Sequence, residues 1–315
     1  MSALPVKRAA DLEARPEEQR WLVEGLWSAQ GVGIVGGEPK SFKSFLALDM
    51  AVSVASGAPC LRRFPVAQRG SVLVFPAEDA LHVVRSRLAG IAAAAGVDFA
   101  SLPVDVITAP VLRLDVQDHA RKLRETVEAL RPRLLVLDPF VRLHRRDENQ
   151  ANEVAPLLAF LRDLQRRYDV AVLLVHHARK GAGHERGGQA LRGSSELHAW
   201  GDSNLYIRRK RDALILSVEH RAAPSPSDLQ LALRDDGPAV ALHVVDEKAP
   251  STGTNTGEPT LAERVEQALA AAPLSQRQLR ESCKVRTTNL CATLASLTAS
   301  GRVRKLPGGV YALTG

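Results

Sequence analysis

GVGIVGGEPKSFKSFLALDMA, residues 31–51, carries the strongest signal for the architecture of this chain. Its apolar start, residues 31–35, predicts a buried strand, and the apolar run from Phe45 predicts a helix. Between them Gly37, Lys43 and Ser44 stand at the spacing of the GxxxxGK[ST] pattern. Glycine lets backbone N–H groups turn toward phosphate oxygens, and the start of the helix adds its dipole to the same anion. The stretch therefore predicts a phosphate-binding loop.

The loop supplies the predicted nucleotide contacts. We expect Lys43 to neutralise the β and γ phosphates and the Ser44 hydroxyl to hold Mg²⁺. Phe42 occupies the position where the pattern has glycine. Its N–H is retained, so we expect it to contact phosphate if the residue is helical, while its bulk leaves the turnover rate open. The predicted ATP-binding residues of the loop are Gly36, Gly37, Glu38, Pro39, Lys40, Ser41, Phe42, Lys43 and Ser44.

Two further apolar runs end in carboxylates. Residues 134–137 lead to Asp138, and residues 71–75 lead through Pro and Ala to Glu78 and Asp79. Parallel sheets place their sites at the carboxyl ends of strands. Asp138 is therefore predicted to hold Mg²⁺ through water, and Glu78 to act as the base that polarises the attacking water. The alternative is that these acids only cap the following segments, as we expect of Asp79 at the helix that starts near Ala80.

Residues 170–175 predict another strand, which ends in His176 and His177. A polar residue there can sense the γ phosphate and pass its presence to the next loop; the alternative is a hydrogen-bonded histidine pair. The glycine-rich stretch 180–193 that follows carries cations and suits a loop that orders on nucleic acid. The alternative is a solvated surface loop. The predicted DNA contacts there are Lys180, Arg186 and Arg192, and the segment 142–146 is also basic.

The order of the predicted elements gives the fold class. Strands at 31–35, 71–75, 104–107, 134–137 and 170–175 alternate with helices at 44–55, 80–95, 118–130 and 152–168. Near-continuous apolar strands separated by helices predict an α/β fold with a mostly parallel sheet covered on both faces. After Gly193 the pattern changes, and residues 204–209, 213–218, 229–233 and 240–245 are expected to add antiparallel strands at one edge.

A second domain follows a linker. Residues 248–259 are small, polar and rich in Gly, Pro and Thr, which predicts a flexible linker between domains at 1–247 and 260–315. Helices at 261–271, 274–281 and 287–299 and a hairpin at 301–313 resemble a winged helix-turn-helix. Recognition-helix residues would then meet a DNA groove and hairpin residues its phosphates, although such modules also bind protein. The residues in these roles are Arg286, Thr287 and Asn289, then Arg302 and Arg304.

Charge and composition limit the function classes. The 315 residues carry a net charge of +7, which suits an anionic partner, although a GC-rich genome also yields arginine-rich proteins. Three cysteines without a CxxC pair argue against a disulfide or zinc framework. With neither a long apolar span nor an apolar leader, the sequence predicts a cytoplasmic protein that does not enter the membrane.

Together these motifs resemble the RepA-like AAA family ATPases, RecA-type proteins related to hexameric replicative helicases. The segments that carry the resemblance lie between Trp21 and Val245: residues 21–25, 37–44, 78–79, 138, 147–149, 176–177 and 192–195. It implies a RecA-like P-loop core, ATP with Mg²⁺, and a homo-oligomeric, hexameric ring with ATP at subunit interfaces.

The resemblance also assigns residues. Glu78 would be the catalytic carboxylate, Asp138 the Walker B acid and His177 a sensor. Arg87, nine residues after Glu78, matches an arginine that approaches the nucleotide. An arginine finger from the neighbouring subunit is expected as well, and Arg208 is its candidate.

The sequence thus predicts a Mg²⁺-dependent ATPase of helicase or translocase type that acts on DNA, in replication of a plasmid, phage or mobile element. Single-stranded DNA would bind the core and duplex DNA the winged helix. One alternative is an ATP-controlled DNA-binding regulator without unwinding activity. Another is a nucleotide binder whose Phe42 has slowed turnover.

Overall fold

The computed structural model describes residues 4, 6–12, 16–177, 195–210, 213–245, 261–283, 290, 293–294, 297–298, 301–306 and 309–314. Two compact units divide the chain, Met1–Glu247 and Lys248–Gly315. The predicted linker, residues 248–259, and the cationic loop, residues 180–193, lie outside the described residues.

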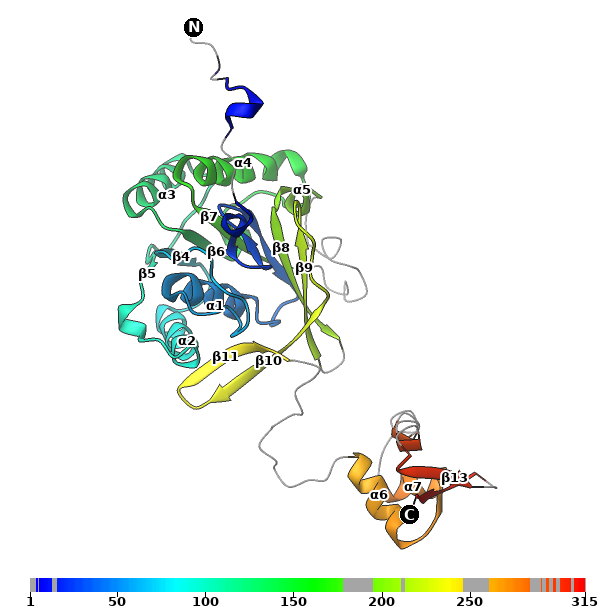
Figure 1. Ribbon diagram of the computed structural model, residues 1–315. Coiled ribbons are helices and arrows are strands. Elements are labelled where there is room, and N and C mark those ends of the chain that lie inside the picture. Colours follow the sequence, from blue (N-terminus) through cyan, green and yellow to red (C-terminus); the bar gives the residue numbers. More distant parts are fainter. Residues whose placement is uncertain are drawn as a thin grey trace. The chain divides into compact units, whose positions relative to one another are not determined.

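A nine-stranded sheet forms the centre of the larger unit, in the order β11-β10-β9-β8-β3-β7-β6-β4-β5 (Figure 1). The strands from β8 to β5 are parallel, which confirms the predicted parallel core. Both faces of the sheet are covered, so a strand such as β3 is buried along its whole length. Its members are β3 (Val32–Gly37), β4 (Val72–Pro76), β5 (Val104–Val106), β6 (Leu134–Asp138), β7 (Ala171–His177), β8 (Ser203–Lys210), β9 (Ala213–His220), β10 (Leu229–Asp236) and β11 (Ala239–Val244).

The expectation that β8 would be an antiparallel edge strand is wrong. β8 pairs in parallel with β3, and only β9, β10 and β11 run antiparallel. The connection from β7 to β8 contains helix α5 (Ser195–Trp200), and a crossover of this length returns the chain in the same direction. The β8–β9 connection spans only residues 211–212, which reverses the chain. β8 therefore lies directly beside the strand that precedes the phosphate loop.

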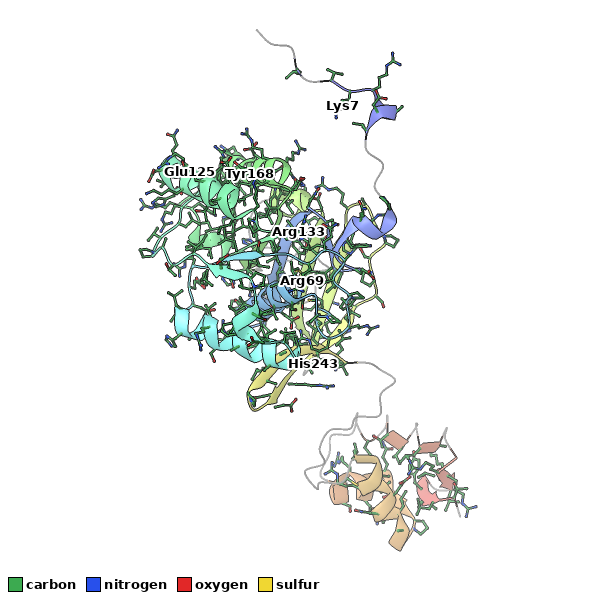
Figure 2. The ribbon with its side chains drawn as sticks, turned by 60° about the vertical axis from the view of Figure 1, so that its left-hand side comes forward. Lys7, Arg69, Glu125, Arg133, Tyr168 and His243 are labelled. Atoms are coloured by element: carbon green, nitrogen blue, oxygen red, sulfur yellow. The ribbon has the colours of Figure 1, made fainter. Side chains whose placement is uncertain are left out.

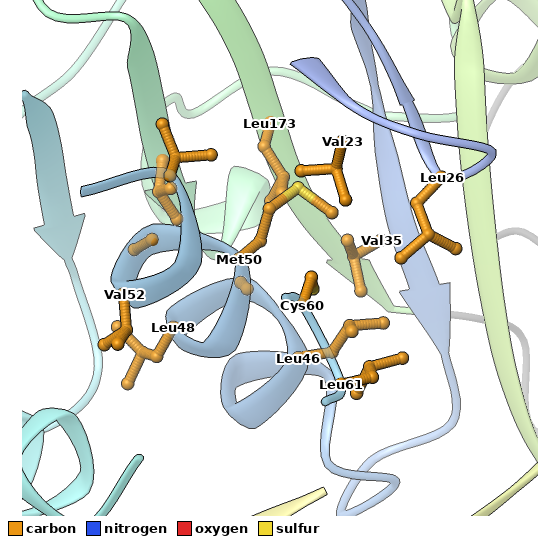
Figure 3. Close-up of a cluster of buried hydrophobic side chains, with 14 of the residues drawn as sticks. Val23, Leu26, Val35, Leu46, Leu48, Met50, Val52, Cys60, Leu61 and Leu173 are labelled. Carbon is orange, nitrogen blue, oxygen red and sulfur yellow. The ribbon is translucent and has the colours of Figure 1, made fainter. Parts of the chain in front are cut away.

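Helices cover the sheet on both faces (Figure 1). α1 (Lys43–Ser56) and α2 (Leu81–Ala94) share one core with strand residues of β3, β6 and β7. Figure 3 shows the part of this core around α1, where Leu46 and Met50 lie with Val35 and Leu173. The opposite face carries α3 (Gln117–Leu130), α4 (Ala151–Tyr168) and α5, which form a second core. α1 is apolar on nearly all sides because it is enclosed, whereas α3 buries only Leu123 and Val127.

Short elements complete the larger unit. The hairpin β1 (Trp21–Val23) and β2 (Trp27–Ser28) buries Leu22 and Trp27 in the α1 core. The short 3₁₀ helices are η1 (Ala9–Asp11), η2 (Glu17–Arg20), η3 (Phe99–Ser101) and η4 (Phe140–Arg142). η4 follows β6 directly and so begins at the carboxyl end of the sheet.

The outer faces of the helices are polar. Glu125 on α3 accepts a hydrogen bond from Arg121 Nη1 at 2.6 Å, and both side chains are exposed (Figure 2). In the described part of the chain, none of the helices is both long enough and apolar enough to span a bilayer.

The smaller unit has its own apolar core. Its elements are α6 (Leu261–Ala271), β12 (Leu274–Ser275), α7 (Gln276–Cys283), β13 (Val303–Leu306) and β14 (Val310–Leu313). The expected serine cap is present, since Ser275 Oγ accepts from Gln278 N at 3.4 Å and Gln278 Oε1 accepts from Ser275 N at 2.9 Å. β13 and β14 form the expected hairpin. The helical residues Leu290, Leu294 and Leu297 are buried in the same core, and the rest of the expected helix 287–299 is described only in part.

Candidate nucleotide-binding site

The phosphate loop connects β3 to α1 at the carboxyl edge of the parallel strands. Gly37 pairs with Ile207 of β8, and a Cβ on Gly37 would lie 2.3 Å from the Ile207 carbonyl oxygen. No side chain can be accommodated there, so the backbone itself forms the wall of the loop. Ser41 Oγ is buried and has no hydrogen-bond partner among the described residues. A buried hydroxyl of this kind suits a ligand that supplies an acceptor.

Phe42 adopts a left-handed backbone, with φ +65°, immediately before α1. The sequence analysis required a helical Phe42, and the structure corrects it, because the backbone has the left-handed conformation that glycine adopts without strain. The ring packs edge-on against Phe45 at 6.2 Å between centroids. The Arg209 guanidinium lies 5.5 Å from the centre of the Phe42 ring. The aromatic contacts thus hold a residue that the backbone disfavours.

Two substitutions at Phe42 test this conformation. Both Phe42→Ala and Phe42→Gly lose the ring contacts, but only glycine relieves the left-handed strain. We expect the glycine variant to be more stable than the alanine variant by about 1 kcal/mol, measured by urea denaturation. Equal midpoints, or a more stable alanine variant, would contradict the left-handed backbone at this position.

Lys43 is buried at the first residue of α1, where only 5% of it is exposed. Its Nζ donates a hydrogen bond to the Glu38 carbonyl oxygen at 2.6 Å. Burial lowers the pKa of Lys43 to about 8, although the nearby Asp138, Glu78 and Glu38 charges oppose that shift. A buried ammonium whose hydrogen bond goes to a carbonyl fits a site that receives phosphate.

Asp138 ends β6 and accepts a hydrogen bond from the Ser44 side chain. Burial raises the pKa of this carboxyl to about 6, and Asp79 and Glu78 add to the rise, whereas Ser44 and Lys43 oppose it. A hydroxyl and a carboxylate side by side are oxygen ligands of the type that Mg²⁺ prefers. Within the described residues, however, no group of three or more His, Cys, Asp or Glu side chains forms a metal site by itself. Ser44 and Asp138 therefore fit Mg²⁺ that arrives with phosphate oxygens and water.

Glu78 and Asp79 follow β4, the strand beside β6. Each has an arginine partner: Arg142 Nε donates to Glu78 Oε1 at 2.7 Å, and Asp79 pairs with Arg87. The expectation that Asp79 caps the next helix is wrong, because α2 begins after Ala80 and its first turn has no side-chain cap. The acid instead fixes Arg87, whose guanidinium also lies 5.5 Å from the centre of the Phe45 ring.

His177 ends β7 and stands level with Gly37 in the sheet register. Burial and the Lys43 charge lower its pKa. Its Nδ1 is buried and has no hydrogen-bond partner among the described residues. The adjacent His176 faces elsewhere, with its Nδ1 at 3.8 Å from Glu148 Oε1. The two histidines therefore have different surroundings, and only His177 reaches the loop.

A cavity of about 600 Å³ joins these groups. It contains nine of the predicted residues: Lys40, Ser41, Phe42, Lys43, Ser44, Glu78, Arg87, Asp138 and His177. Gly36, Gly37, Glu38 and Pro39 form the loop behind it. The cavity is also lined by Phe45, Asp79, Val175 and Arg209, which the sequence analysis did not assign to the site. A strand beside the loop was the only available signal for Arg209, and it was lost when β8 was taken as an edge strand.

The remaining predicted residues lie elsewhere. Arg208 pairs with Asp228 and does not line the cavity, and its role as a finger stays a prediction because that role needs a neighbouring subunit. Arg302 pairs with Glu266 at 2.6 Å, and Arg304 is exposed on β13. The other predicted DNA contacts, Lys180, Arg186, Arg192, Arg286, Thr287 and Asn289, lie outside the described residues.

Comparisons with known proteins agree with this architecture. A model of the AAA domain family matches residues 2–183. The chain is similar to the ATPase domain of one solved structure, with a TM-score of 0.52 and 14% identity over 68% of this chain and 84% of that chain. It is also similar to a DnaB-like replicative helicase, with a TM-score of 0.52 and 13% identity over 68% of this chain and 57% of that chain. The RadB recombinase gives a TM-score of 0.51 and 15% identity over 69% and 92%. These likenesses show the fold, a RecA-like α/β core.

Proposed function

The chain belongs to the AAA domain family and is a P-loop ATPase with a RecA-like fold, and we propose that it uses Mg²⁺ and ATP to act on DNA as a helicase or translocase. One observation carries the proposal: Lys43, Ser44, Glu78, Asp138 and His177, from four different elements and loops, meet in one cavity. Cation, metal-binding oxygens and a carboxylate are the parts that phosphoryl transfer to water requires.

Each residue has one proposed task. Lys43 and the loop backbone bind the β and γ phosphates, and Ser44 and Asp138 hold Mg²⁺, which would neutralise charge on the leaving phosphates when bound. Glu78 accepts a proton from the attacking water. His177 contacts the γ-phosphate side and transmits its presence to the segment that follows β7. Arg87 binds the nucleotide from α2, where Asp79 and Phe45 fix its guanidinium.

The DNA part of the proposal follows from charge and from the family resemblance. We propose a RepA-like role in replication of a plasmid, phage or mobile element, with a homo-oligomeric, hexameric ring that completes each site through an arginine finger. Single-stranded DNA would bind the core through Lys180, Arg186 and Arg192. Two of the similar structures are described as a replicative helicase and a recombinase, and these descriptions belong to those proteins.

The smaller unit is proposed to be a winged helix-turn-helix domain, joined by a flexible linker at 248–259, that binds duplex DNA. A capped helix α7, a buried stripe at Leu290, Leu294 and Leu297, and the hairpin β13–β14 support this. Exposed Arg304 on β13 is available for phosphate, and Arg302 must first leave Glu266. Arg286, Thr287 and Asn289 would read the groove.

DNA-dependent hydrolysis tests the proposed function. We expect single-stranded DNA to raise the rate of ATP hydrolysis several-fold, and we expect this stimulation to fall as salt rises, because phosphate contacts release counterions. The measurement is phosphate release with no DNA, with single strands and with duplex, on protein whose mass in solution is known. Nucleotide-dependent binding to one duplex site, without stimulation or unwinding, would instead support the ATP-controlled regulator. Negligible hydrolysis under every condition would support a slow nucleotide binder.

A further inference from the structure

We propose that Arg142 is a positioning residue that withholds the Glu78 carboxylate from the attacking water until a nucleic-acid phosphate binds Arg142 in its place. This inference rests on the proposed function, because it takes Glu78 as the base and nucleic acid as the partner. Neither the family match nor the sequence motifs assign a role to the Arg142–Glu78 pair.

The first step is the contact itself. Arg142 Nε lies 2.7 Å from Glu78 Oε1 and donates a hydrogen bond to it. The two residues follow neighbouring parallel strands, since Pro76 of β4 is level with Asp138 of β6. A carboxylate oxygen that accepts a guanidinium hydrogen bond has fewer lone pairs available to a water molecule. The pair therefore competes directly with the task proposed for Glu78.

The second step is that the backbone carrying Arg142 is fixed. Phe140 and Leu143, on either side, are fully buried. His144 is also buried, and its Nε2 lies 3.5 Å from the Glu148 carboxylate, which lies 3.8 Å from His176 of β7. These anchors tie the segment 140–148 to the strand that carries His177. Release of Glu78 therefore requires only a new rotamer of the Arg142 side chain.

The third step is that the pair is weak enough to switch. The Arg142 side chain is 61% exposed and the Glu78 side chain 41%. Exposed pairs of this kind shift an equilibrium by no more than about fivefold. Arg145 and Arg146 are exposed on the same segment, so a polyanion is drawn to the surface where Arg142 lies. A phosphate oxygen offers Arg142 a stronger and bidentate partner.

The test compares Arg142→Gln with the unmodified full-length protein. Without DNA, we expect kcat for ATP hydrolysis to rise by up to about fivefold, the limit for such a pair, with KM unchanged. Because Glu78 is already free, the ratio of stimulated to basal rate falls toward one with single-stranded oligothymidine. Arg142→Lys retains the charge, so we expect it to restore a low basal rate and the stimulation. Loss of fold alone would lower kcat and would not be rescued by lysine.

Matched variants separate the possible outcomes. Arg121→Gln removes an exposed arginine–glutamate pair of similar geometry on α3, and we expect it to leave both rates unchanged. If Glu78→Gln abolishes hydrolysis but Arg142→Gln leaves basal kcat unchanged or lower, the inference about Arg142 is overturned and the role of Glu78 stands. If basal kcat rises while full stimulation by DNA remains, the coupling to nucleic acid is overturned. If Glu78→Gln hydrolyses ATP normally, the proposed function of this site and the inference both fail.

Discussion

Replacement of Lys43 by alanine is expected to lower the rate of ATP hydrolysis by about a hundredfold or more, the range for loss of one charge-stabilising group in a closed site. Lys43 is the only lysine or arginine of the described residues that is both buried and lines the cavity, which makes it the cation for the developing phosphate charge. Phosphate release measures the rate, and titration with a fluorescent ATP analogue measures binding. Hydrolysis within a few-fold of the original rate would contradict the proposed site.

The same lysine should reduce the stability of the free protein. The pKa of Lys43 in the folded state is about 8, below its value of 10.5 in the unfolded chain. The folded protein therefore binds fewer protons between pH 8 and 10.5, so stability rises with pH across that window and the penalty is complete below pH 8. Lys43→Met is expected to stabilise the nucleotide-free protein at pH 7 by up to about 3 kcal/mol.

Urea denaturation at pH 7 and pH 10 measures this effect, with Lys40→Met as the control. Lys40 belongs to the same loop but is exposed, so its replacement should change stability by no more than about 0.5 kcal/mol. A Lys43→Met variant that unfolds at lower urea than the original protein at pH 7 would contradict the burial of an ammonium at the loop. A gain in stability together with a loss of hydrolysis is typical of a residue kept for function.

Local patterns were sufficient to predict the core of this fold. A run such as Leu134–Asp138 has apolar side chains on both faces, and only an enclosed strand buries both. The spacing of Lys43 and Ser44 likewise depends on one loop and one helix, so neighbouring residues in the chain determine it. The carboxyl-end position of Glu78, Asp138 and His177 followed from the rule for parallel strands.

Contacts between distant segments were not predictable in this way. Arg209 reaches the cavity because β8 lies beside β3, and that neighbour depends on a short helix, Ser195–Trp200, without a clear apolar period. The Arg142–Glu78 pair joins residues that are 64 positions apart. The left-handed backbone at Phe42 depends on ring contacts with Phe45 and Arg209, whereas the local sequence favours the opposite conformation.

Replacement of Asp138 by asparagine is expected to abolish Mg²⁺-dependent hydrolysis and to stabilise the nucleotide-free protein at neutral pH. Asparagine keeps an oxygen near Ser44 but removes the negative charge that would hold the metal shell. The expected loss of hydrolysis is again about a hundredfold or more. Phosphate release over a range of Mg²⁺ concentrations measures it, and recovery of the full rate at high Mg²⁺ would show that Asp138 only strengthens metal binding.

The stability effect has a definite direction with pH. The pKa of Asp138 is about 6 in the folded state, against an ordinary value of 3.8 for this carboxyl. The folded protein therefore holds this proton more tightly, so its stability falls as pH rises from about 4 to 6 and stays lower above that range. Asp138→Asn cannot lose a proton, and at pH 7 it should be more stable by up to about 3 kcal/mol. Thermal unfolding at pH 4, 6 and 7.5 compares the two proteins. If the difference between them does not grow across this range, the buried carboxylate is not the source of the strain. If it does grow, Asp138 is held charged in a place that only a bound cation makes favourable, and Mg²⁺ with ATP should then stabilise the original protein far more than the variant.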